Sequence, residues 1–388
     1  MVTLKKLFFL IIMSLGVALY SSAQEALKNS DEVTLVVSGD GYNKEEATNV
    51  ALRSAIEQTF GTFVSSNSEI LNDKLVKDEI ITVSSGSIKN FSYVTEFQRD
   101  GKYFITLKAI VSIGKLVEYT KSKGGQTELA GALFATKVKM NKLYAENEMK
   151  ALQNLRKEIK SFLPYIFDYE IQVEDPTEYQ DSDSTEYHCD AQVEIKVNDN
   201  INLIRDIFYN TLQAISLPYI EQEEYRKMKL NITNIAIQNS NDGGYYYLRN
   251  TRDDLYNFFS LLQKDILQEV LSFKVIDNIG EYKFIYSDFY DYNYTSRNQF
   301  LISGFAVGYD RQYYYCHTKA KRFSEIDGLF GSNSSRFIIE GNSGTYDSVT
   351  YLLGLFDRDL KLYSTIDLTL RYSLDELMKI SNISVKHY

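Results

Sequence analysis

Residues 30–120 constrain the fold of this chain most, because strong local signals follow one another there in a fixed order. Val33–Val37 is a short apolar run typical of a buried strand, and Gly39-Asp40-Gly41 after it predicts a turn. Asn43 with Glu46 three residues later resembles a capping box and predicts the start of a helix that ends near Phe63. A strand followed by a capped amphipathic helix is therefore the first expectation.

The same region continues with a second helical pattern and a hairpin. Residues 70–80 carry apolar side chains at helical spacing, so we expect a second helix there. Residues 91–97 and 103–113 alternate apolar and polar side chains, and Arg99-Asp100-Gly101-Lys102 lies between them. An Asp-Gly pair between alternating runs is a strong hairpin signal. The whole unit is predicted as β-α-(α)-β-β.

These residues also carry a family resemblance. Val36-Val37-Ser38-Gly39-Asp40-Gly41, then Glu46-Ala47, Ala51–Gln58 and Gly61, together with the hairpin, resemble the N-terminal domain of flagellar assembly protein T and of small envelope lipoproteins. Similar blocks occur in exported, uncharacterised proteins of Gram-negative bacteria. The resemblance covers about a quarter of the chain. It implies a non-enzymatic envelope or assembly role and offers no catalytic residues.

The first 23 residues are typical of a signal peptide. Lys5 and Lys6 precede the apolar run Leu7–Tyr20, and Ser21-Ser22-Ala23 supplies small residues for cleavage between Ala23 and Gln24. The run is shorter than the roughly 20 residues that a membrane-spanning helix needs. An uncleaved anchor is the alternative, and the small residues after the run favour cleavage.

Export narrows the classes of partner. The first cysteine is Cys189, so the lipidated cysteine of the resembling lipoproteins is missing and their membrane attachment cannot be transferred. Without a later transmembrane segment, we expect a periplasmic, outer-membrane-associated or secreted protein. Loss of Lys5 and Lys6 makes the formal net charge of −10 more negative, and acidic proteins repel nucleic acid and anionic membranes. Export also disfavours nucleotide cofactors.

The rest of the chain predicts further mixed α and β structure. Leucines and other apolar residues near heptad spacing predict a long helix that Pro164 ends. Two alternating runs, 165–173 and 187–197, follow with an acidic loop between them. The predicted class is α+β with antiparallel sheets. The expected segments are a signal peptide at 1–23, the flagellar-T-like domain at 24–120, a long helix or linker at 121–164, a β-hairpin and helix region at 165–235, and a Tyr-rich domain at 236–388.

Cys189 and Cys316 are the only cysteines. In an exported protein they could form a disulfide, and two free, buried thiols are the alternative. His188-Cys189 and Cys316-His317 together suggest a zinc site, but neighbouring residues of a strand point to opposite faces, so four ligands could hardly converge. No metal site is therefore predicted.

The catalytic motifs are weak. Gly39-Asp40-Gly41 lacks the third glycine of a dinucleotide fingerprint. Asp181-Ser182-Asp183-Ser184-Thr185 matches a phosphatase signature, but an acidic loop rather than an apolar strand precedes it. Ser112-Ile113-Gly114-Lys115 matches a bare S-x-x-K, with the serine at the end of a strand rather than opening a helix. Asp288 and Asp291 alone do not define a glycosidase pair. We predict no catalytic residues and no cofactor.

Tyrosine is the compositional outlier, with 31 Tyr beside 22 Phe and no Trp. Tyrosine supplies rigid contact area with a polar tip. Core and sheet filling, a protein-binding face and a glycan-binding face all remain open, although the lack of Trp disfavours glycans. The predicted binding surface consists of Tyr245, Tyr246, Tyr247, Tyr290, Tyr292, Tyr294, Tyr313 and Tyr314.

The function predicted from these features is non-enzymatic. We expect an exported envelope protein that acts through contacts with other envelope proteins, in an assembly or scaffold role. A glycan-binding module built on the Tyr-rich region is one alternative. A hydrolase with an unrecognised carboxylate site is another. The sequence does not indicate the oligomeric state.

Overall fold

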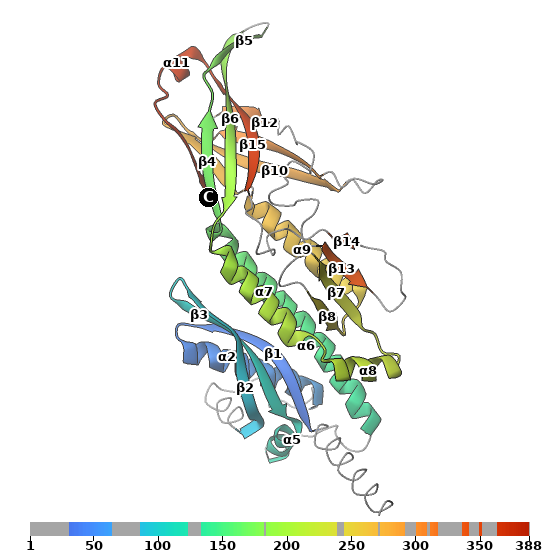
Figure 1. Cartoon of the computed structure of the whole chain (residues 1–388). Coiled ribbons are helices and arrows are strands. Elements are labelled where there is room, and N and C mark those ends of the chain that lie inside the picture. Colours follow the sequence, from blue (N-terminus) through green and yellow to red (C-terminus); the bar gives the residue numbers. More distant parts are fainter. Residues whose placement is uncertain are drawn as a thin grey trace, which may run out of the picture. The chain divides into compact units, whose positions relative to one another are not determined.

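The computed structural model describes residues 31–63, 86–122, 133–181, 184–238, 244–270, 272–291, 300–308, 311–316, 336–340, 349–350 and 363–387. The predicted α+β class with antiparallel sheets is confirmed, because every pairing among the described strands is antiparallel and helices accompany the sheets (Figure 1). The chain divides into two compact units. The first comprises 1–154 and 213–215, and the second comprises 155–212 and 216–388.

The described part of the first unit is a three-stranded sheet with helices. Its strands have the order β1-β3-β2. Its elements are β1 (Glu32–Gly41), α2 (Lys44–Phe63), β2 (Ile88–Arg99), β3 (Lys102–Ser112), α5 (Ile113–Ser122) and the first part of α6 (Leu133–Phe162). The predicted hairpin is confirmed, since Arg99 pairs with Lys102 and both Asp100 and Gly101 have positive φ. The predicted helix at 70–80 lies outside the described residues.

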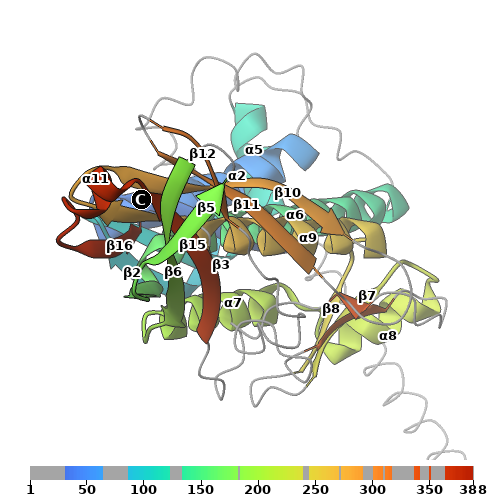
Figure 2. The same cartoon turned by 90° about the horizontal axis from the view of Figure 1, so that it is seen from above.

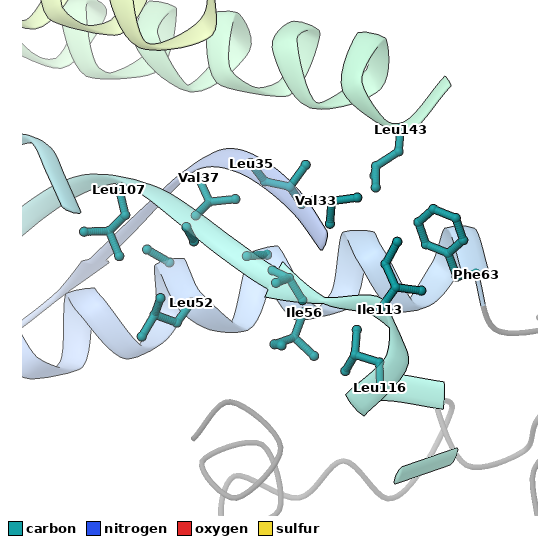
Figure 3. Packing of buried hydrophobic residues seen from close by; sticks show 14 of the residues in the cluster. Val33, Leu35, Val37, Leu52, Ile56, Phe63, Leu107, Ile113, Leu116 and Leu143 are labelled. Carbon is teal, nitrogen blue, oxygen red and sulfur yellow. The ribbon is translucent and has the colours of Figure 1, made fainter. Parts of the chain in front are cut away.

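The core of the first unit lies between α2 and the β1–β3 face. Alternate residues of the strands, among them Val33, Leu35 and Leu107, are fully buried against Leu52 and Ile56 of α2 (Figure 3). Burial of each such side chain contributes about 1.5–3 kcal/mol. The core also includes Leu143 of α6, Ile113 and Leu116 of α5, and Phe63 at the end of α2.

The glycines of β1 correct one expectation. The predicted turn at Gly39-Asp40-Gly41 is wrong, because β1 continues through all three residues. A Cβ atom on Gly39 would lie 2.4 Å from the carbonyl oxygen of Ala47 and 2.5 Å from the amide nitrogen of Ala51. The glycines therefore allow the backbone of α2 to lie directly on the strand. The predicted cap is confirmed, since Asn43 Oδ1 accepts the Glu46 N–H at 2.8 Å.

An asparagine of α6 covers the outer edge of β1. The Val36 N–H donates to Asn147 Oδ1 at 2.9 Å, and Asn147 Nδ2 donates to the Val36 carbonyl at 2.9 Å. Asn147 Nδ2 also lies 3.1 Å from Gln58 Oε1 of α2. The side chain of Asn147 thus takes the place of a neighbouring strand at the point where β1 would otherwise leave two buried groups unpaired.

The described part of the second unit contains three antiparallel sheets. The first has the order β15-β6-β4, with β5 also on β6; its strands are β4 (Phe167–Val173), β5 (Thr177–Asp181), β6 (Ser184–Val197) and β15 (Tyr363–Tyr372). The second has the order β12-β11-β10-β9-β16; its strands are β9 (Phe273–Asp277), β10 (Glu281–Asp291), β11 (Phe300–Gly308), β12 (Arg311–Cys316) and β16 (Ile383–His387). The third has the order β14-β13-β7-β8; its strands are β7 (Thr233–Gln238), β8 (Tyr245–Leu248), β13 (Arg336–Glu340) and β14 (Val349–Thr350).

The described part of the second unit also contains helices. They are η1 (Leu163–Tyr165), α7 (Ile201–Ile215), α8 (Tyr219–Lys227), α9 (Arg252–Val270) and α11 (Leu374–Leu377). The last turns of α6 lie beside α9 (Figure 2), where Asp265 accepts from Arg156 Nε at 2.5 Å and Lys160 Nζ at 3.0 Å. A capping box of Ser373 and Glu376 opens α11.

Candidate interaction surface

The predicted tyrosine surface is only partly assembled. Tyr245, Tyr246 and Tyr247 form β8, where the exposed fractions of Tyr245 and Tyr246 are 62% and 6%. Alternation along the strand places Tyr246 in the core and leaves Tyr245 exposed, so Tyr246 is a packing residue and its assignment to the surface was wrong. The other predicted tyrosines cannot be placed on this surface, because Tyr292 and Tyr294 lie outside the described residues. The side chains of Tyr290, Tyr313 and Tyr314 are also outside the described part.

Two hydrogen bonds hold β8 against the segment that leads into α8. The Leu217 N–H donates to the Tyr247 carbonyl at 2.8 Å, and the Tyr247 N–H donates to Ser216 Oγ at 2.9 Å. Pro218 follows with an extended backbone and starts α8. The helix begins there because proline has no N–H to contribute and its fixed φ suits a helix entrance.

The junction presents three large exposed side chains. Tyr219 and Ile220 in the first turn of α8 are 71% and 75% exposed. Tyr245 lies two residues before Tyr247, so all three are within three residues of the Leu217–Tyr247 bond. We call Tyr219, Ile220 and Tyr245 the α8–β8 patch. Sequence analysis missed Tyr219 and Ile220, and the available signal was an apolar pair directly after Pro218.

A small buried cluster and an ion pair hold the residues next to the α8–β8 patch in place. Leu217, Tyr225 and Ile232 form a small buried cluster, with Leu230 and Tyr247 against it. Arg249 is a central link, since its Nε lies 2.9 Å from the Tyr225 hydroxyl and its Nη2 donates to Glu221 Oε2 at 2.7 Å. Exposed side chains whose backbone is held by such contacts lose less conformational entropy on binding.

Among the described residues, no group of three or more His, Cys, Asp or Glu side chains could hold a metal ion. Asp288 and Asp291 lie in β10, and their side chains are outside the described part.

The S-x-x-K match has a different geometry from the one expected. Ser112 ends β3 but also directly precedes α5, and its Oγ accepts the Lys115 N–H at 3.4 Å. The expectation that this serine opens no helix was therefore wrong. Ser112 is nevertheless buried while Lys115 is exposed, so the pair does not form an accessible nucleophile and base.

Cys189 and His188 lie on opposite faces of β6, as expected for strand neighbours. Cys189 of β6 is buried opposite Leu370 and has a free thiol, and burial raises the pKa of that thiol. His188 points to the other face and stacks on Tyr179 with ring centroids 4.5 Å apart. Because the Cys189 thiol is free, the structure does not support the predicted disulfide with Cys316, whose side chain lies outside the described part.

Comparisons with known proteins add no relative. No protein-family model, curated protein or solved structure matches this chain significantly. The resemblance of residues 30–120 to the flagellar-T N-terminal domain accordingly stays a prediction. Within the described residues, no helix combines the length and apolar character needed to cross a membrane.

Proposed function

We propose that this protein is a non-enzymatic, exported component of the bacterial envelope that acts through protein–protein contacts. The observation that carries the proposal is the α8–β8 patch, in which Tyr219, Ile220 and Tyr245 stand exposed on a packed base. Aromatic side chains with polar tips are enriched in protein interfaces, and central ones contribute most of the binding energy. The signal-peptide pattern at residues 1–23 supports export.

Site-specific photo-crosslinking in the envelope of the native host tests this proposal. A benzophenone side chain would replace Tyr219 or Tyr245 in the full chain, and Tyr42, which is 74% exposed in the first unit, provides the matched control. We expect the two patch positions to give the same adduct and the control to lack it. The proposal is wrong if both patch positions match the control.

The location has its own test. We expect the mature protein in the periplasmic or outer-membrane fraction, with its first residue at Gln24. Fractionation followed by mass determination of the intact protein measures both properties. Recovery of the uncleaved chain in the cytoplasm would contradict the export proposal.

A further inference from the structure

The strand β5 has an open edge. Among the described strands β5 pairs with β6 alone, and Figure 1 shows it continuing along β6 beyond the end of β4. Residues 177–180 are exposed. In an antiparallel pair every second residue directs its N–H and C=O groups away from the partner, so this edge can accept another strand.

The chain segment that contains β5 is acidic. Residues 161–195 contain ten Asp and Glu and no Lys or Arg. Glu178 lies on β5 itself, and Glu186, whose side chain is 41% exposed, lies directly opposite Tyr179 in the register. Like charges at short distance repel, so pairing with a second copy of this edge is disfavoured. An extended segment with Lys or Arg would instead gain a favourable charge interaction opposite each carboxylate.

Tyr179 supplies a second, independent feature that favours a cation. Its ring stacks on His188 at an interplanar angle of 15°, which fixes its orientation, and its side chain is still 51% exposed. A fixed, exposed aromatic ring attracts an ammonium or guanidinium group through the negative charge of its π face. The alternation of a strand then presents Tyr179 on one face of β5 and Glu178 on the other.

We infer that the edge of β5 binds an extended, Lys- or Arg-rich segment of a partner protein by strand addition. Backbone hydrogen bonds would supply affinity, and the carboxylates with Tyr179 would select basic side chains. This inference deepens the proposed contact function by naming the chemistry of one partner. The β5 edge shares no residue with the α8–β8 patch, so each surface can fail without the other.

Peptide binding to the full mature chain tests the inference. The probe is a fluorescein-labelled peptide, Lys-Thr-Lys-Val-Lys-Thr with blocked ends, measured by fluorescence anisotropy. We expect saturable binding that weakens as salt rises from 0.05 to 0.5 M. The same peptide N-methylated at alternate residues keeps its charge but cannot complete a ladder, and a Glu-Thr-Glu-Val-Glu-Thr peptide reverses the charge. Both should bind at least tenfold more weakly.

Variants locate the site. Glu178→Gln combined with Glu186→Gln should weaken the basic peptide at least fivefold, and Tyr179→Leu about threefold. Glu224→Gln on α8 removes an exposed carboxylate elsewhere and should change nothing, as should Tyr219→Ser with Tyr245→Ser. Far-ultraviolet circular dichroism checks that each variant keeps its fold. Equal binding of the N-methylated peptide, or an unchanged affinity in the Glu178→Gln, Glu186→Gln variant, would overturn the inference.

Discussion

At the scale of single residues, Asn147 shows how one side chain can complete a sheet. Replacing it with Ala leaves the Val36 N–H and carbonyl buried without partners, so we expect a loss of about 1–3 kcal/mol in the free energy of unfolding. Urea denaturation measures the loss. Lys150→Ala, an exposed change on the same helix, is the control and should stay within about 0.5 kcal/mol. Equal stability of the two variants would contradict this role of Asn147.

The buried thiol of Cys189 makes the stability of the fold depend on pH. Burial, reinforced by Asp190 and Asp175, raises the pKa of its thiol above the ordinary 9.0, so the folded state favours the protonated form. The contribution to stability is therefore complete below pH 9.0 and falls as pH rises above it. Because the thiolate is the reactive form, we expect iodoacetamide to alkylate folded Cys316→Ser protein at least tenfold more slowly than the same protein in urea at pH 8. Equal rates would show an accessible Cys189.

At the scale of elements, the contact of α2 with β1 depends on Gly39. Gly39→Ala would place a Cβ atom against the backbone of α2, so we expect the free energy of unfolding to fall by about 1–3 kcal/mol. Gly61→Ala is the matched control, because Gly61 lies in α2 with nothing near its missing Cβ atom. Alanine is the better helix former, so that variant should gain about 0.5–1 kcal/mol. Thermal unfolding monitored by circular dichroism gives both values, and the same sign for both would refute the packing argument.

Elements with their own local signals could be predicted, and those that depend on distant partners could not. Asn43 and the Asp100-Gly101 pair act on neighbouring residues, so the start of α2 and the β2–β3 hairpin were predicted correctly. The acidic segment between the predicted strands was expected to be a loop, yet Thr177–Asp181 forms β5 because it pairs with β6. Exposed, charged residues carry no apolar alternation from which a strand could be read.

The candidate surface, too, contains residues that the sequence predicted and residues that it did not. Tyr245 was predicted from the tyrosine-rich composition. Tyr219 and Ile220 were missed because apolar residues are usually buried. Their exposure follows from the course of the chain through Leu217 and Pro218. The helices α5 and α8 were also missed. Both are short, so too few residues are present to establish a helical period.

At the scale of the whole molecule, the two units have separate stabilising contacts although α6 supplies residues to both. Leu143 belongs to the core of the first unit, whereas Arg156 and Lys160 hold Asp265 within the second. The side chain of Asp265 is 3% exposed, and Asp265→Ala would leave two cations without their common partner. Arg156 and Lys160 stay partly exposed to water, which reduces the cost of removing their partner. We therefore expect the free energy of unfolding of the second unit to fall by about 2–3 kcal/mol.

We therefore expect the two units to unfold in separate calorimetric transitions. Gly39→Ala acts on the first core alone and should lower the temperature of one transition, and Asp265→Ala should lower the other. Differential scanning calorimetry of the mature chain measures both, with Lys150→Ala as the variant that should move neither. Each unit keeps its own buried contacts when the other melts, so the two can open independently. One transition that both variants lower would instead mean that α6 couples the two units into a single cooperative body.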